Sequence, residues 1–169
     1  ITEESGRANL LREGIPAERI HAVGNLMIDS LKKNLARAME SDVTQRLELP
    51  ERYGLVTLHR PANVDDAGHL GEILGALKEI GKELPLIWPM HPRTRGRIES
   101  NGAVLPAGLR LTDPLGYLDF LCLQAKSAVV LTDSGGIQEE TTVLRVPCLT
   151  LRDNTERPIT IEHGSNRLA

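Results

Sequence analysis

The sequence is poor in aromatic residues and in long apolar runs, and each shortage excludes a class of function. One Trp, two Tyr and one Phe in 169 residues offer few rings on which the bases of single-stranded nucleic acid could stack. No run approaches the roughly 18 to 20 consecutive apolar residues that a membrane-spanning helix needs. The first residues also lack the charged and then apolar pattern of a secretory leader. We therefore expect neither a nucleic-acid-binding protein nor a membrane protein.

Cysteine and net positive charge are also scarce. The two cysteines, Cys122 and Cys148, have no C-x-x-C spacing and no nearby histidine, so neither a zinc site nor a disulfide framework is expected and the chain is predicted to be cytoplasmic. No metal site is expected at His59 or His91, which lack Asp, Glu or Cys at ligand spacing. With 20 basic and 23 acidic side chains the net charge is −3, so any recognition of phosphate must be local.

What the sequence does contain is an alternation of short apolar runs with longer stretches of helical period. This pattern is typical of an α/β domain, in which helices cover a parallel sheet. Strands are predicted at 20–23, 55–58, 86–90, 109–112, 128–132 and 148–151, with the start of a further strand at 166–169. Helices are predicted after Asn25 and at 70–80, 93–100, 115–125 and 135–145, and the segment 41–52 is a polar linker or a short helix.

Polar residues follow each predicted strand at its carboxyl end. In an open parallel sheet the ligand crevice lies beyond these ends, so the loops that begin at His59, His91, Asp133 and Arg152 are expected to share one rim. Loops are polar in most proteins, which is the alternative explanation for any one of them. The recurrence of histidine and arginine along one edge favours an anion-binding rim.

The most informative stretch is TDSGGIQEE at 132–140. Ser134 at the position before a helix, followed by Gly135 and Gly136, leaves backbone N–H groups uncovered where the helix dipole favours negative charge. The pattern predicts a cradle for a phosphate. An ordinary capped helix is the alternative, because the stretch lacks the Gly-Lys-Ser/Thr ending of a Walker A loop.

Glu140 lies on the same helix face as the apolar Ile137 and Leu144, where an ionised carboxylate needs a donor. The two hydroxyls of a ribose could supply it, or Glu140 could pair with a basic neighbour such as Arg157. His59 and His91 could be ordinary hydrogen-bonding residues rather than functional ones. Phe120, at helical spacing, could simply belong to the core.

Five stretches together resemble one known family, the non-hydrolysing UDP-N-acetylglucosamine 2-epimerases. They are LHRPANVDD, MHPRTRGRI, LTDPLGYLDFL, TDSGGIQEE and RDNTERP. The resemblance covers essentially the whole chain. It implies two Rossmann-like domains facing across a cleft, as in the GT-B architecture, with this chain supplying the second domain. Residues 1–18 would then be the end of the preceding domain and a linker, and residues 19–169 a nucleotide-binding domain truncated at both ends.

The family's functional residues can be placed on this sequence by motif. The resemblance implies that Ser134 and Gly135 contact the diphosphate, that Glu140 binds the ribose, and that Phe120 lies beside the uracil. It further implies that Arg157 reaches the phosphates and that His59 takes part in catalysis. Gly136, Arg60 and His91 complete the expected substrate-binding set.

The family's activity implies a reaction and partners for the parent protein. UDP-GlcNAc and UDP-ManNAc are interconverted by eliminating UDP across carbons 1 and 2 and adding it back, without any cofactor. The proton-transferring acids are expected in the missing N-terminal domain, so no general base is assigned here. The parent is expected to be a homodimer serving polysaccharide biosynthesis, and this chain alone is expected to bind UDP without turnover.

Two positions depart from the family pattern, which more often has Glu where Ala62 and Ile159 stand. The first departure leaves the contacts of the His59 loop open. Two other functions stay open as well: a stand-alone UDP-sugar binding module, and half of a nucleotide-sugar glycosyltransferase.

Overall fold

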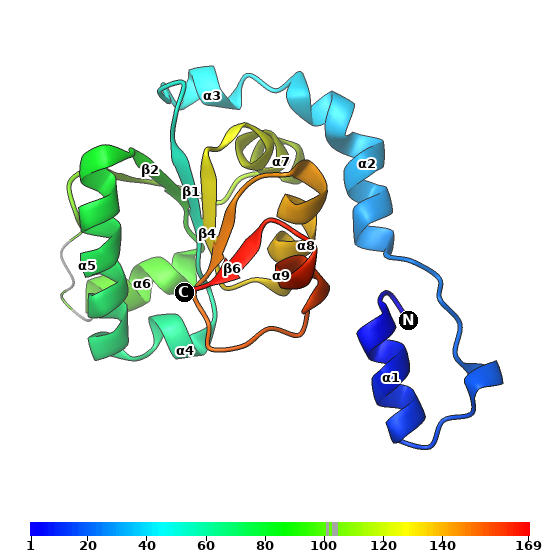
Figure 1. The fold of residues 1–169 in the computed structure, drawn as a ribbon. Coiled ribbons are helices and arrows are strands. Elements are labelled where there is room, and N and C mark those ends of the chain that lie inside the picture. The colour runs from blue at the N-terminus through cyan, green and yellow to red at the C-terminus, as the bar shows by residue number, and fades with distance from the viewer. Residues whose placement is uncertain (101, 103–104) are drawn as a thin grey trace.

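The computed structural model describes residues 1–100, 102 and 105–169 and contains a six-stranded parallel sheet of order β3-β2-β1-β4-β5-β6 (Figure 1). The strands are β1 Gly54–Thr57, β2 Leu86–Pro89, β3 Leu109–Thr112, β4 Val129–Thr132, β5 Cys148–Thr150 and β6 Asn166–Leu168. Five of the predicted strands are therefore confirmed to within two residues at each end. The predicted start of a strand at 166–169 is confirmed as β6, which pairs with β5.

The prediction of a strand at 20–23 is wrong. The segment follows a short 3-10 helix, Ala17–Arg19, and continues in extended backbone outside the sheet. The backbone N–H of Val23 bonds to the carbonyl oxygen of Ile1, and Val23 is 77% exposed. An apolar run becomes a strand only beside a partner strand. Here, within the part of the chain that the structure describes, no strand of the sheet pairs with the segment, and the backbone of Val23 bonds to Ile1 instead.

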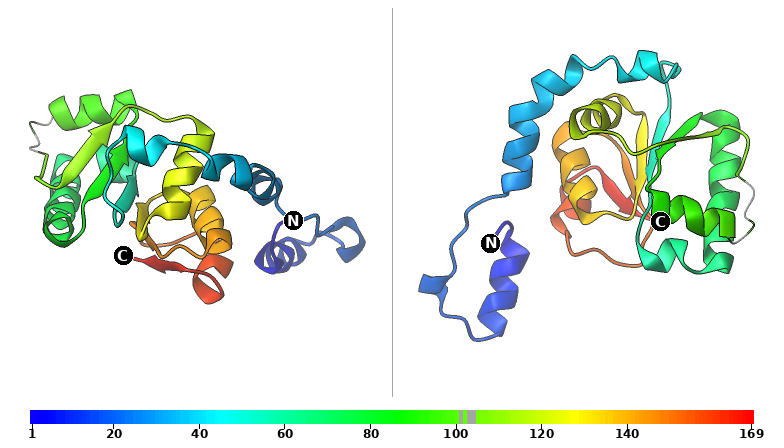
Figure 2. Two further views of the ribbon diagram at one scale, coloured as in Figure 1. Left: turned by 90° about the horizontal axis from the view of Figure 1, so that it is seen from above. Right: turned by 180° about the vertical axis from the view of Figure 1, so that it is seen from behind.

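Helices cover both faces of the sheet, as predicted (Figure 1). The helices on one face are α5 Ala67–Glu83 and α6 Pro92–Ser100, preceded by the short α4 Pro61–Val64. The helices on the other face are α7 Tyr117–Lys126, α8 Gly135–Leu144 and α9 Ile159–Glu162, with α2 Leu26–Met39 packed outside them and α3 Val43–Arg46 leading to β1. The remaining helix, α1 Glu4–Arg12, has no buried residue and lies apart from the sheet (Figure 2).

Local sequence explains where the two long helices begin. The side chain of Asn25 accepts a hydrogen bond from the backbone N–H of Met27, as expected for the residue that caps α2. Asp66 caps α5 by accepting from the N–H of His69 at 2.7 Å. The spacing of Leu70, Ile73, Leu74 and Leu77 then buries one face of α5 against the sheet.

The chain order places a switch point between β1 and β4. From β1 the sheet grows through β2 to β3, and from β4 it grows in the other direction through β5 to β6. Loops that leave the carboxyl ends of β1 and β4 therefore diverge to opposite faces and open a crevice between them, where open α/β sheets bind their ligands. The loops that start at His59 and Asp133 leave these two ends.

Two glycines differ in the space available for a side chain, at Gly71 within α5 and at Gly108, where the chain approaches α5 closely. Gly71 in α5 has open space where a Cβ would lie, so Gly71→Ala is expected to raise the free energy of unfolding by about 0.5–1 kcal/mol. Gly108 has φ +88°, and its Cβ would lie 2.6 Å from the carbonyl oxygen of Gly81. Gly108→Ala is expected to lower the free energy of unfolding by about 1–3 kcal/mol, and urea unfolding measures both. Equal effects of the two changes would contradict this packing.

Candidate functional site

The carboxylate of Asp133 ties the loop after β1 to the end of β4. It is fully buried and accepts hydrogen bonds from the backbone N–H groups of His59 (3.0 Å) and Arg60 (2.8 Å) and from the side-chain amide of Asn63 (3.1 Å). The His59 ring lies against the same group, with Nδ1 3.1 Å from Oδ1. Arg60 Nε also donates to the Asp133 carbonyl oxygen at 2.9 Å. One buried carboxylate thus holds His59 and Arg60 directly beside Ser134.

These contacts change the pKa of both partners. The hydrogen bond with Asp133 raises the pKa of His59 above its ordinary 6.5, although partial burial opposes the rise. Burial alone would raise the pKa of Asp133, but the hydrogen bonds from the His59 ring and from the Arg60 and His59 amides outweigh it, so the pKa lies below 3.8. The ring, which lies beside the mouth of α8, therefore keeps its proton to a higher pH than an ordinary histidine. There it can attract an anion or donate a proton.

The first turn of α8 presents backbone donors to this crevice. Ser134 is the capping residue by backbone conformation, as expected, and its hydroxyl makes no capping hydrogen bond, so the alternative of an ordinary side-chain-capped helix does not hold. The first N–H groups of a helix have no partner within the helix, and here the Ser134 hydroxyl does not take one. A Cβ on Gly135 would approach only Arg157 Cγ, at 3.9 Å. The amide end at Gly135 is therefore open to an acceptor from outside.

The absence of a side chain at Gly136 has a different structural role. A Cβ at this position would lie 2.6 Å from Cε of Met27, which comes from the first turn of α2. The second glycine therefore lets α2 approach α8, while Gly135 leaves room at the mouth. Met27 is 46% exposed, so this contact between α2 and α8 lies near the surface.

Glu140 is buried, with 6% of its surface exposed. Burial raises its pKa, the Gln124 amide opposes the rise, and the charge of Glu139 adds to it. The pKa of Tyr117 is raised as well, mainly by burial of its phenol and to a smaller extent by the charge of Glu140. Phe120, one helical turn beyond Tyr117 on α7, packs half-buried against a core cluster. The Glu140 carboxylate thus lies near one aromatic residue of α7, Tyr117, and Phe120 follows Tyr117 one turn later.

Arg157 does not pair with Glu140, the alternative raised by the sequence. Its Nε lies 3.0 Å from Oε1 of Glu139 instead, and its NH1 donates to the carbonyl oxygen of Glu156 at 3.2 Å. Glu139, to which no sequence pattern pointed, thus pairs with the arginine that lies nearest to Gly135.

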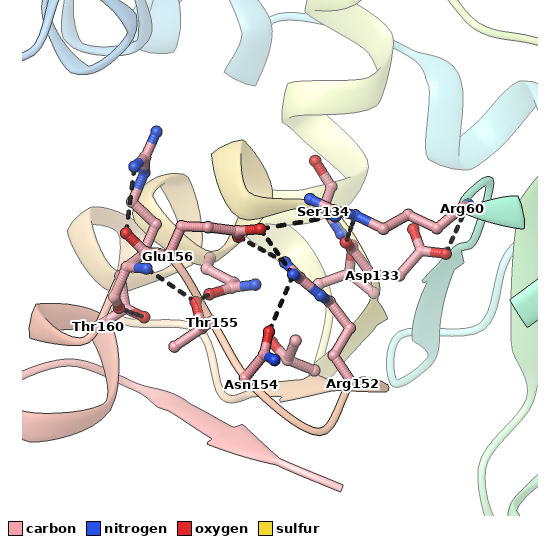
Figure 3. A network of polar contacts seen from close by, with 12 residues as sticks. Arg60, Asp133, Ser134, Arg152, Asn154, Thr155, Glu156 and Thr160 are labelled. Carbon is pink, nitrogen blue, oxygen red and sulfur yellow. Dashed lines mark hydrogen bonds and ion pairs between the residues drawn. The ribbon is translucent and has the colours of Figure 1, made fainter. Parts of the chain in front are cut away.

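A second group of charges faces the crevice from the loop after β5 (Figure 3). Arg152 makes a bidentate pair with Glu156, both N···O distances being 2.7 Å, and also donates to Asn154 at 3.3 Å. Arg60 NH1 lies 3.7 Å from the same carboxylate. Glu156 consequently has a pKa lowered to about 2, chiefly through its hydrogen bond with Arg152.

Buried polar groups hold this loop to α8. Gln138 Oε1 accepts from Thr155 Oγ1 at 2.5 Å and from Asn166 Nδ2 at 3.3 Å. Thr155 in turn accepts the N–H of Arg157 at 2.9 Å. Thr160 donates to the Arg157 carbonyl oxygen at 2.7 Å. The backbone of Arg157 is therefore fixed relative to α8 on both sides of the residue.

The structure places the remaining predicted residues farther from the α8 mouth. His91 is exposed just after β2, and β1 separates that strand from β4 in the sheet. Ala62 is exposed in α4, and Ile159 is 44% exposed at the start of α9. Ile159 is the first residue of α9, so the departure there falls on a helix start.

A cavity of about 650 Å³ lies on the face that carries α5, not at the α8 mouth. Its apolar lining comes from α5, β4 and β5, and Arg60 is the one predicted site residue among its described lining residues. We place the functional site at α8 because charged groups and open amides converge there. Within the described residues no helix is long and apolar enough to cross a membrane, and no cluster of His, Cys, Asp and Glu could hold a metal ion.

Comparison with known proteins gives consistent matches along the chain. The model of the family described as UDP-N-acetylglucosamine 2-epimerase matches residues 1–169. The chain is 39% identical over 171 residues to the UDP-N-acetylglucosamine 2-epimerase of Methanococcus maripaludis, covering 95% of this chain and 47% of that protein. It is 41% identical over 165 residues to the UDP-2,3-diacetamido-2,3-dideoxy-D-glucuronate 2-epimerase of Pseudomonas aeruginosa, covering 95% and 45%.

Comparison with solved structures points to the same family. The UDP-GlcNAc 2-epimerase of Methanocaldococcus jannaschii in complex with UDP-GlcNAc and UDP matches 98% of this chain and 48% of that chain, with TM-score 0.91 and 40% identity. The predicted Rossmann-like fold, one half of a two-domain architecture, is confirmed. The chain spans about half the length of the curated relatives it matches.

The His59–Asp133 contact predicts a measurable titration. Followed by NMR, the His59 ring is expected to titrate above 6.5, and Asp133→Asn is expected to lower that pKa because the acceptor loses its charge. The contact stabilises the fold fully below the ordinary histidine pKa and is lost as pH rises through the folded value. Asp113→Asn, at a carboxylate with 96% of its side chain exposed, is the control. A wild-type His59 pKa at or below 6.5 would contradict the assignment.

Proposed function

This chain belongs to the UDP-N-acetylglucosamine 2-epimerase family, and we propose that it is the UDP-binding half of an enzyme that interconverts UDP-GlcNAc and UDP-ManNAc. The observation that carries the proposal is the open amide end of α8 with Arg157 over Gly135 and His59 beside Ser134. Helix amides, a guanidinium and a histidine with a raised pKa converge there, and all three favour an anion.

The diphosphate of UDP fits this set of groups. Its oxygens would accept from the amides of Gly135 and Gly136 and from the Ser134 hydroxyl, which is not used as a cap. Arg157 would approach from the side of Gly135. Because the chain has a net charge of −3, the attraction is supplied locally, by this rim.

The nucleoside would lie beside Glu140. A ribose offers two hydroxyl donors to a buried carboxylate whose neighbours do not neutralise its charge. Phe120 and Tyr117, from the first turns of α7, would flank the uracil. Binding of the diol would favour the ionised form of Glu140 and so lower its raised pKa.

The same donors that bind UDP would assist the reaction. When the bond between carbon 1 and the diphosphate oxygen breaks, its electron pair stays with UDP as the proton leaves carbon 2. Amides and cations at the departing oxygen stabilise the charge that develops. UDP and the proton then return to the glycal intermediate with inverted configuration at carbon 2. In this proposal His59 acts beside the diphosphate.

The proton transfers at carbon 2 belong to the other half of the parent in this proposal. The relatives are about twice as long as the match, which leaves room for a second, N-terminal domain that completes the cleft. The relatives from M. maripaludis and P. aeruginosa are named for different sugars but both for 2-epimerases of a UDP-sugar. The parent is proposed to work as a homodimer, and the 169-residue chain by itself to bind UDP without turnover.

The cradle is tested by calorimetric titration with UDP. Ser134→Ala is expected to weaken binding about fivefold, because one hydrogen bond to a charged oxygen is lost. Glu140→Gln is expected to weaken binding of UDP and of uridine alike by about tenfold, since both contain the ribose. The exposed Glu162→Gln is the control and should bind as wild type. Equal affinity of all the proteins for UDP would remove the proposed site.

The role of Arg157 is tested by comparing two ligands. Arg157→Ala is expected to weaken the binding of UDP by about 10- to 100-fold and to change the affinity for uridine by less than about twofold, because only UDP carries diphosphate charge. Arg145→Ala, at the far end of α8, is the matched loss of one positive charge. If UDP and uridine lose affinity equally in Arg157→Ala, the phosphate role is wrong.

A further inference from the structure

Glu139 is a buried carboxylate in α8, the helix whose amides face the crevice. The residue is 9% exposed, and its Oε2 atom has no hydrogen-bond partner within the described residues. Its charge also contributes to the raised pKa of the adjacent Glu140. A carboxylate in such surroundings costs stability unless it is paired, and its partner is Arg157.

That pair joins a buried acid to a partly exposed arginine, and it is an ion pair, because Arg157 Nε has no hydrogen-bond partner within the described residues. Nε of Arg157 lies 3.0 Å from Oε1 of Glu139, while 36% of the Arg157 side chain is exposed against 10% for Glu139. The Cγ of Arg157 lies close to where a Cβ of Gly135 would be. The inner edge of the guanidinium is therefore held by a buried acid, and the arginine passes over the bare glycine at the mouth of the helix.

The backbone of the same residue is held independently. The N–H of Arg157 donates to Thr155 Oγ1, and Thr155 in turn donates to Gln138 Oε1. Gln138 and Glu139 are consecutive residues of α8, so one fixes the loop and the other fixes the side chain that the loop carries. Arg157 and the amides of α8 are thereby kept in a fixed position relative to each other.

We infer that Glu139 is a positioning residue that orients the Arg157 guanidinium over the α8 amides for a nucleoside diphosphate. The inference rests on the proposed function. It assigns no contact with the ligand to Glu139, which acts through Arg157. Holding the guanidinium in place beforehand removes the entropy cost of ordering a long side chain on binding.

The sign of the mutational effect separates positioning from simple electrostatics. Removing a negative charge near a phosphate site would by Coulomb attraction tighten the binding of an anion. Loss of orientation would weaken it. Glu139→Gln keeps the size of the side chain and removes the charge that holds Nε, so the two effects act in opposite directions.

The experiment is calorimetric titration of the 169-residue chain with UDP and with uridine. Glu139→Gln is expected to weaken the binding of UDP about fivefold to tenfold and to leave the affinity for uridine within about twofold of the wild-type value. The double variant Glu139→Gln/Arg157→Ala should bind UDP no more weakly than Arg157→Ala alone, because both changes disable the same group. Glu162→Gln again controls for the loss of one negative charge.

Each outcome decides one of the two claims. If Arg157→Ala weakens UDP selectively while Glu139→Gln binds UDP equally or more tightly, or if the two losses add in the double variant, the positioning role is overturned and the proposed function stands. If Arg157→Ala leaves UDP binding unchanged, the proposed function fails first. Circular dichroism checks folding. Should Glu139→Gln not fold, Glu139→Asp replaces it and must show the same selective loss, since its shorter carboxylate withdraws from Nε.

Discussion

The buried carboxylate of Asp133 is the interaction on which the site depends. It stands at the end of β4, and its acceptor capacity is used by the N–H groups of His59 and Arg60, the amide of Asn63 and the His59 ring. A parallel sheet brings the ends of β1 and β4 together, but it does not dictate how the loops beyond them are arranged. Asp133 does so, because a buried charge must collect donors, and the donors available to it are those of the loop after β1.

Around that anchor the chain separates charges of opposite sign. Glu139 and Glu140 lie buried on α8, while His59 and the guanidinium of Arg157 face the crevice. An acidic protein can in this way present a locally positive rim. The acids that hold the cations in place are covered by protein, and the cations they hold reach solvent.

Most helices and the strands of the sheet can be predicted because their signals are local. The cap at Asn25, the apolar stripe of α5 and the short runs of β2 and β3 each contain their own evidence. The segment 20–23 shows the limit of this reasoning. Its apolar character is like that of the real strands, and only the structure reveals that it bonds to Ile1 and not to a strand of the sheet.

The site was predictable in its backbone and less so in its side chains. Ser134 and Gly135 mark the open helix end from sequence alone. That Met27 packs on Gly136, and that Arg157 pairs with Glu139 rather than Glu140, depends on how α2 and the loop after β5 approach α8. Gln138 and its partner Thr155 are 17 residues apart in sequence, and no local pattern links them.

The most direct measurement of the central claim is a UDP titration of the nitrogen-15 labelled chain followed by amide chemical shifts. The account predicts that the Gly135 and Gly136 signals move together and saturate with the ligand, because the diphosphate accepts from these N–H groups. Unmoved glycine signals during a titration in which residues of the cavity beside α5 shift instead would contradict it.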